Sequence, residues 1–271
     1  MSTQLSSAEQ ELAARSDFTQ DVLSLLKETF QTELLHWSID AYRAADEVLP
    51  SYSVAVRLGE PEMIEGAGFP VRRLQADGVF TLIAHGNARD MVLQLRPQLQ
   101  EAGYIIALVG SDSDIRNLTR ESIEEAEEKY AGQCAIGVLK GTEVCDFLRL
   151  QNTNGANFDL DTESIIRKLA NWEQLCSLHI VGAGFDWVDL QFDTLPDNLQ
   201  AFAEEIYDFC PDTLDQGYVG PDPTNGREMS EMSQEEMLQM VEQIGDAIDS
   251  QTPADLAEFL SREKRLWLWW D

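Results

Sequence analysis

Short apolar runs of strand length alternate along this chain with longer stretches of helical periodicity, and this alternation restricts the possible folds. Runs of about four to eight apolar residues are typical of buried strands, whereas apolar residues three or four apart are typical of one helix face. The strand-length runs lie at residues 79–84, 104–109, 134–139 and 178–181, and helical spacing occurs at 88–102, 165–172 and 199–209. Because both kinds of element recur, we predict an α+β fold with mixed or antiparallel sheets packed by amphipathic helices.

The N-terminal part is predicted to begin with helices and to continue into a sheet. Apolar residues between residues 7 and 37 recur at mostly helical spacing, which favours one or two amphipathic helices. Residues 79–109 then have the pattern of a strand, a helix and a second strand. Gly103 is expected to end that helix, and Pro97 is expected to kink or break it, because proline removes a backbone donor.

The C-terminal part carries clearer signals for the ends of its elements. A helix is expected to begin at a cap formed by Asp161 or Thr162, and a later helix is expected to be entered through Pro196. Apolar residues alternate at 188–192, which predicts a half-buried strand. The chain ends in Leu-Trp-Leu-Trp-Trp-Asp, which we interpret as an inner strand of the C-terminal sheet. An exposed aromatic anchor for a partner is the alternative.

Length and composition indicate two lobes, because a single domain typically has about 100 to 200 residues. We predict an N-terminal helical segment at residues 1–50, an α/β lobe at 51–145 and a C-terminal α+β domain at 146–271. Residues 216–227 are rich in glycine and proline and are predicted to form an exposed linker.

The chain is strongly acidic. Asp and Glu number 49 against 19 Lys and Arg, which gives a formal net charge of −30. Such a surface repels nucleic acid and anionic lipid, and it attracts basic partners over a Debye length of about 8 Å. Residues 51–120 are nearly balanced in charge, so most of the excess lies in residues 121–271. We therefore expect the C-terminal half to be the electrostatic face and the lobe before it to be the scaffold.

The sequence shows neither an export signal nor a membrane span. Its first 17 residues are polar and mixed in charge, and no run approaches the roughly 18 apolar residues that a spanning helix needs. We expect a cytoplasmic protein without a membrane partner. A hydrophobic content of 44% allows a sizeable core.

The cysteines are predicted to be buried reduced thiols, because they are far apart and form no Cys-x-x-Cys pair. They are Cys134, Cys145, Cys176 and Cys210. They and the three histidines lack the clustering of zinc ligands. A thiol nucleophile at Cys210, with His179 as its base, is the chemical alternative. The acidic surroundings favour the protonated thiol instead, and Pro211 is explained more simply as a helix stop.

Carboxylates offer a second chemical alternative, since several of them could converge on Mg²⁺ or Ca²⁺. These are Asp186, Asp189, Asp193, Asp212 and Asp215. Their spacing is not that of a calcium loop, and most are better explained as caps or solvated side chains. The sequence also lacks a phosphate-binding loop, a complete dinucleotide-binding glycine pattern and a Gly-x-Ser-x-Gly elbow. We predict no catalytic residue, no metal and no cofactor.

Several short motifs occur from about residue 148 onward. They include Asn-Gly-Ala-Asn at 154–157, Phe-Cys-Pro-Asp at 209–212, Asp-Gln-Gly at 215–217 and Trp-Trp-Asp at 269–271. Through these motifs the C-terminal half resembles a bacterial family that is catalogued as domain of unknown function 4253. The resemblance implies a bacterial origin and an α+β domain, and it brings no established activity. An acidic segment at 218–236 departs from the family pattern.

Charge and the lack of catalytic motifs favour a binding function. Our leading hypothesis is a cytosolic immunity protein, of the toxin–antitoxin kind, that neutralises a secreted, type VI-like toxin by protein–protein binding. A nuclease is a suitable toxin, because it presents a positive groove to phosphate that an acidic protein can occupy. An adaptor or regulatory protein without a toxin, and a metal-dependent hydrolase of unrecognised type, are the alternatives.

The predicted contacts with the basic partner are carboxylates in two acidic segments that we expect to be exposed. They are Glu121, Glu124, Glu125, Glu128, Asp222, Glu228, Glu231 and Glu235. The sequence leaves the oligomeric state open.

Overall fold

The structure, a computed structural model, describes residues 5–64, 66–111, 129–130, 132–215 and 251–270. The chain divides into two compact units. Unit 1 consists of Met1–Thr153 and Ile180–Phe185, and unit 2 consists of Asn154–His179 and Asp186–Asp271. As predicted, the fold is α+β, and its strands form a mixed, mostly antiparallel sheet.

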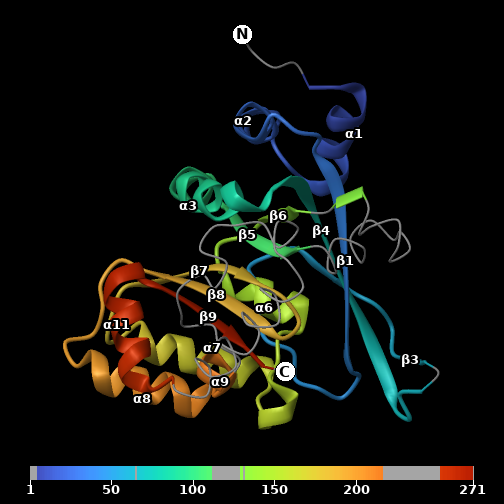
Figure 1. The fold of residues 1–271 in the computed structure, drawn as a ribbon. Coiled ribbons are helices and arrows are strands. Elements are labelled where there is room, and N and C mark those ends of the chain that lie inside the picture. Colours follow the sequence, from blue (N-terminus) through green and yellow to red (C-terminus); the bar gives the residue numbers. More distant parts are fainter. Residues whose placement is uncertain (1–4, 65, 112–128, 131, 216–250, 271) are drawn as a thin grey trace, which may run out of the picture. The chain divides into compact units, whose positions relative to one another are not determined.

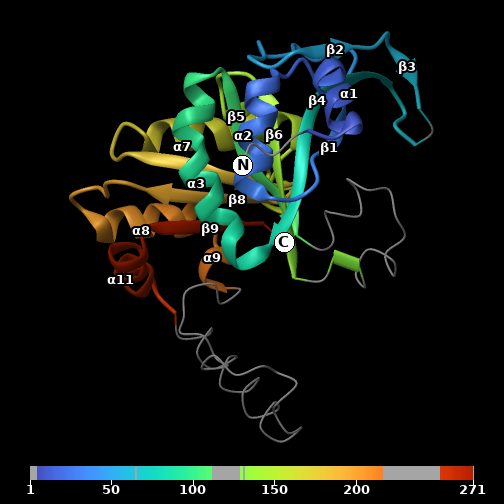
Figure 2. The ribbon, with the colours of Figure 1, turned by 90° about the horizontal axis from the view of Figure 1, so that it is seen from above.

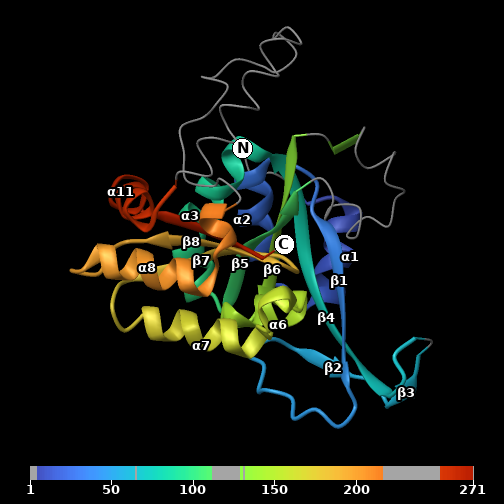
Figure 3. The same cartoon turned by 60° about the horizontal axis from the view of Figure 1, so that its bottom comes forward.

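Unit 1 is built around one long strand, β4 (Pro70–Ala84). Along one side, β4 pairs antiparallel with β1 (Leu35–Ala44). Along its other side it pairs in succession with β6 (Gln133–Lys140), β2 (Val56–Leu58) and β3 (Glu62–Met63), as Figure 3 shows. Strand β5 (Tyr104–Ser111) is antiparallel to β6 and is joined to β7 (Leu178–Ala183) by a parallel pair, Leu108 and Gly182. Among the described strands β1 pairs with β4 alone, so β1 is an edge strand.

Helices pack on this sheet. Helix α1 (Ser7–Ser16) contacts β1 and β4, and α2 (Gln20–Phe30) follows it in the chain. Helix α3 (His85–Glu101) lies along β5, as Figure 2 shows. Helix α6 (Cys145–Gln151) contacts β1.

One core cluster of unit 1 lies between α6 and one face of the sheet. Trp37 and Ile39 of β1 share it with Phe147 and Leu150 of α6, and the rings of Trp37 and Phe147 are 5.7 Å apart. The Trp37 ring needs a glycine beneath it, because a Cβ on Gly137 would lie 2.3 Å from that ring.

Unit 2 packs helices against a pair of antiparallel strands. The strands are β8 (Trp187–Phe192) and β9 (Arg265–Trp269), and the helices are α7 (Thr162–Trp172), α8 (Leu199–Phe209), α9 (Asp212–Asp215) and α11 (Pro253–Glu263), with a short 3-10 turn at Ala156–Phe158. Helices α8 and α11 contact each other, and Figure 1 shows them side by side. Trp172 meets Phe202 and Phe209 edge to face, and Phe209 meets Trp270 in the same way.

The structure confirms several predicted elements. β4, α3 and β5 form the predicted strand, helix and strand, and Gly103 follows α3 with a left-handed φ of 81°. Asp161 caps α7 by accepting a hydrogen bond from the Ser164 N–H. None of the four cysteines forms a disulfide among the described residues; Cys134, Cys176 and Cys210 are buried and Cys145 is half-buried.

Other predicted elements were wrong. The N-terminal helices end at Phe30, and Leu35–Trp37 begins β1, because Gln31 turns the chain with a left-handed φ of 55°. Helix α3 has no break at Pro97 and continues to Glu101, whereas the kink that was the other possibility stays a prediction. The cap of α8 is Asn198, two residues after the predicted entry at Pro196.

The two C-terminal strands also differ from their predictions. Every residue of β8 except Gln191 is buried, so this strand is more than half-buried. Strand β9 pairs only with β8 among the described strands and is therefore at an edge, not an inner strand. The predicted linker at 216–227 lies outside the described residues, and the predicted domain boundaries stay predictions. No described helix combines the length and apolar character that a membrane crossing requires.

Candidate functional site

All eight carboxylates that we predicted to contact a partner lie outside the described residues, at positions 121–128 and 222–235. Other exposed carboxylates of unit 2 are described. Glu204 and Asp208, four residues apart on α8, and Asp215, at the end of α9, are exposed. We call these three side chains the α8 acidic surface.

One residue of the α8 acidic surface, Asp208, lies in the last turn of α8, where a helix disfavours negative charge. The carboxyl end of a helix dipole attracts cations, yet α8 has no basic residue in its last turn. The hydroxyl of Tyr207 donates a hydrogen bond to Asp215 Oδ1 over 3.3 Å. The charge of Asp215 is the main cause that raises the pKa of Tyr207, and Asp208 adds to it. The negative charge of the α8 acidic surface therefore does not serve to stabilise the helix.

Glu205, the neighbour of Glu204, has a different role. Its carboxylate accepts hydrogen bonds from Lys168 Nζ (2.7 Å) and Trp172 Nε1 (3.0 Å). The bond from Lys168 is the main cause that lowers the pKa of Glu205. Glu205 thus joins α7 to α8, and we leave it out of the acidic surface.

Cys210 has the surroundings of a structural thiol. It is fully buried, and its Sγ donates to the carbonyl of Trp269 over 3.1 Å. Burial raises the pKa of Cys210 to about 11, which keeps the thiol protonated at neutral pH. His179 Nε2 lies 2.7 Å from Asp193 Oδ2. These contacts place Cys210 in the core of unit 2 and give no support to a Cys210–His179 nucleophile.

The aspartates considered as metal ligands are not gathered at one point. Asp189 is buried in β8, opposite Trp267 of β9, whereas Asp193 is exposed and also accepts from Ser177 Oγ at 3.1 Å. Within the described ranges, no three His, Cys, Asp or Glu side chains form a group that could hold a metal ion.

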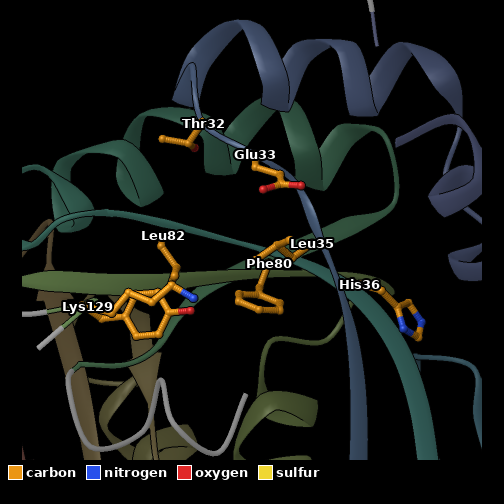
Figure 4. A pocket seen from close by; sticks show the side chains of 8 residues that line it. Thr32, Glu33, Leu35, His36, Phe80, Leu82 and Lys129 are labelled. Atoms are coloured by element: carbon orange, nitrogen blue, oxygen red, sulfur yellow. The ribbon is translucent and has the colours of Figure 1, made fainter. Parts of the chain in front are cut away.

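Two hollows follow β1 of unit 1. The first, of about 530 Å³, has Leu35, Phe80 and Leu82 on its wall. In Figure 4 these apolar side chains lie between Glu33 and Lys129, and His36 points away from them. The second, of about 370 Å³, is lined by the six consecutive residues 37–42 of β1 and by residues 150–152 at the end of α6. Together the hollows follow the edge strand from residue 33 to residue 42.

The other face of β1 and β4 carries paired charges. His36 Nε2 lies 2.8 Å from Asp77 Oδ1, and Arg57 also donates to Asp77. On the same face, Asp40 Oδ1 accepts from Arg73 Nε at 2.9 Å. These carboxylates hold neighbouring strands together.

Sequence reasoning missed both hollows, because it placed residues 35–37 in a helix and so did not find the edge strand. The polar and apolar alternation from His36 to Tyr42 is the signal that could have found it.

Comparison with known families gives one match. The family described as "Domain of unknown function (DUF4253)" matches residues 135–271. Curated proteins and solved structures give no match to this chain. The match covers slightly more than half of the sequence and contains the Phe-Cys-Pro-Asp and terminal Trp-Trp-Asp motifs. The chain belongs to the DUF4253 family of domains of unknown function.

Proposed function

We propose that this protein binds a basic protein partner through the acidic surface of its C-terminal half. The specific form we favour is a cytoplasmic immunity protein of a bacterium, which neutralises a secreted, type VI-like toxin such as a nuclease. The observation that carries the proposal is the uneven charge: residues 121–271 hold 32 Asp and Glu against 9 Lys and Arg.

The described carboxylates support this proposal. The α8 acidic surface collects three exposed charges, and one of them, Asp208, lies in the last turn of α8, where a cation would be more favourable. Charge retained at a cost to stability is typical of a surface that meets a partner of opposite sign. Such a surface accelerates association and makes it sensitive to salt, while a few desolvated contacts set the lifetime of the complex.

The first experiment tests protection. The chain is coexpressed with the product of any neighbouring secreted-effector gene, and survival of the host is measured with and without it. Survival that depends on the chain supports the proposal. If the chain rescues no effector, and the purified chain captures no basic protein from its native host at low salt, the proposal is wrong.

The second experiment tests the surface. The triple variant Glu204→Gln, Asp208→Asn and Asp215→Asn removes three negative charges, and should slow association with the captured partner by about tenfold at low salt. The matched control, Glu11→Gln with Asp21→Asn and Glu28→Gln, removes three exposed charges from α1 and α2. Equal association rates for the two variants would show that only net charge matters and would contradict the assignment of this surface.

A further inference from the structure

We propose that the open edge of β1 is a second binding site, which takes an extended segment of another protein as an added antiparallel strand. The segment has apolar residues at alternate positions and a basic residue at its C-terminal end. This site uses residues of unit 1 and does not depend on the acidic surface proposed above.

The backbone of β1 presents hydrogen-bonding groups on its outer side. The register with β4 continues beyond the strand, where the Ala45 N–H donates to the Pro70 carbonyl over 2.9 Å. Residues directly opposite each other in an antiparallel pair exchange hydrogen bonds at every second position. The odd-numbered residues of β1 therefore bond to β4, and the N–H and C=O groups of His36, Ser38 and Tyr42 point away from it.

One contact supports this alternation directly. Arg43 Nη1 donates to the carbonyl of Tyr42 over 3.0 Å, which is one of the carbonyls that should point outward. The guanidinium covers one end of the edge, as charged side chains commonly do on edge strands. The part from His36 to Ser38 carries no such cover among the hydrogen bonds of the described side chains.

The hollows beside β1 indicate which side chains the added strand should carry. Along a strand, alternate side chains point to one face, and on the face toward α6 those of the added strand would lie beside Leu35 at the first hollow and near Leu150 at the second. An apolar side chain suits the first hollow, and a second one beside Leu150 would enter the other hollow, whose lining also includes Gln151 and Asn152. An added strand of about six residues spans about 20 Å.

A second copy of β1 would not fill these hollows. Its apolar side chains Trp37, Ile39 and Ala41 are already buried in their own core, with exposures of 4%, 4% and 6%. A segment of a different protein brings apolar side chains that are not yet packed, which is why we assign the edge to a different protein.

Charge indicates which end of the antiparallel segment carries a basic residue. Glu33 is exposed two residues before β1, beside the first hollow, and no described residue forms an ion pair with it. In an antiparallel arrangement the C-terminal end of the added strand lies near Glu33. A lysine or arginine there complements its charge.

The test uses fluorescein-labelled peptides of about eight residues and follows binding to the full chain by fluorescence anisotropy. In each peptide of the set, Val, Ile, Leu or Phe alternates with Thr, and a Lys lies near the C-terminal end. Two derivatives of each peptide carry N-methyl groups on alternate backbone nitrogens, one on the odd and one on the even positions. One pattern should abolish binding and the other should preserve it, because only one edge of the peptide bonds to β1.

Two variants of the chain test the site. Ser38→Pro removes an outward N–H without breaking the bonds to β4 and should weaken binding by about tenfold, whereas Ser38→Ala should leave it unchanged. Glu33→Lys should weaken binding of the peptides that carry Lys and strengthen binding of matched peptides that carry Glu. Circular dichroism shows whether Ser38→Pro is folded. If Ser38→Pro is unfolded, the effect of Glu33→Lys on binding of the two kinds of peptide decides the test.

Several results would overturn the proposal: no binding by any peptide of the set, equal binding of both methylated patterns, or a dimer in sedimentation that buries the edge and excludes the peptides. A cross-link from Ser38→Cys to another part of the same chain would do so too. The α8 triple variant should bind these peptides normally, so failure of this proposal and failure of the proposed function are distinguishable.

Discussion

Protonation of Glu9 is expected to destabilise unit 1 in acid. The Glu9 side chain is only 2% exposed. Its carboxylate accepts hydrogen bonds from Lys27 Nζ (2.7 Å), the Ser6 N–H (2.9 Å) and the Leu34 N–H (3.4 Å). Burial raises the pKa of Glu9, but the bonds from Lys27, Ser6 and Leu34 together outweigh it and lower the pKa from 4.5 to about 2. The ionised carboxylate thus ties α1 to α2 and to the residue before β1.

The shift sets the size of the effect. At about 1.4 kcal/mol for each pKa unit, the ionised Glu9 contributes about 3 kcal/mol to the free energy of unfolding. Because the pKa is lower in the folded state, this contribution is complete at neutral pH and is lost as the pH falls from 4.5 toward 2. Glu9→Gln keeps an acceptor oxygen but removes the charge. We expect the variant to be about 3 kcal/mol less stable than wild type at neutral pH, and the difference to shrink steadily in acid.

Urea denaturation between neutral pH and about pH 3, followed by circular dichroism, measures this difference. Glu11→Gln is the matched control, because it removes a negative charge from an exposed position of the same helix. The control corrects for the general relief of repulsion in a chain of net charge −30. If Glu9→Gln were as stable as Glu11→Gln, or if its deficit were the same at neutral and acid pH, the role assigned to the Glu9 charge would be refuted.

Three further results are expected. Gly155→Val should lower the free energy of unfolding by about 2 kcal/mol or more, because a Cβ there lies 2.8 Å from Trp270 Cγ, whereas Gly86→Ala, with open space around it, should change it by less than about 1 kcal/mol; urea denaturation compares the two. Cys210 should resist a thiol reagent in the native protein and react only on unfolding, since its pKa is about 11 and it is fully buried; mass spectrometry of the labelled peptides would contradict this if native labelling were rapid. Deletion of residues 265–271 should unfold unit 2, because β9 and Trp270 carry buried side chains into its core; retained cooperative melting of α7 and α8 in hydrogen exchange would count against it.

The sequence alone was sufficient to predict those helix ends at which local signals and tertiary packing agree. Asp161 predicted the start of α7, and Gly103 predicted the end of α3, because a cap and a left-handed turn are decided by neighbouring residues. The helical continuation into residues 35–37 was wrong, because pairing with β4, a partner distant in the sequence, decides that segment. Pro97 was expected to kink or break α3, and the structure shows no break, because the helix continues through this residue.

The candidate sites also differ in how far the sequence alone predicts them. The charge excess of the C-terminal half is a sum over residues, so composition alone reveals it. The open edge of β1 depends on which strands pair, and no property of residues 35–44 alone identifies it. The protonated state of the Cys210 thiol could be predicted from the acidic composition, and its position at a helix end from the following proline. Its hydrogen bond to the Trp269 carbonyl could not be predicted, because the two residues are 59 positions apart.

The division of the chain into units bears on how members of this family can be separated from their neighbours. The family match begins at residue 135, inside β6, and β6 has β4 and β5 as its partners on either side. Both partners precede the match in the chain, and residues 180–185 return to the same unit. A fragment cut at the family boundary would expose both sides of β6, including the buried Ile136 and Val138, and should aggregate. The stretch of this chain that the family match covers and the stretch that should fold independently are therefore different, and we expect residues 135–271 to need the strands that precede them.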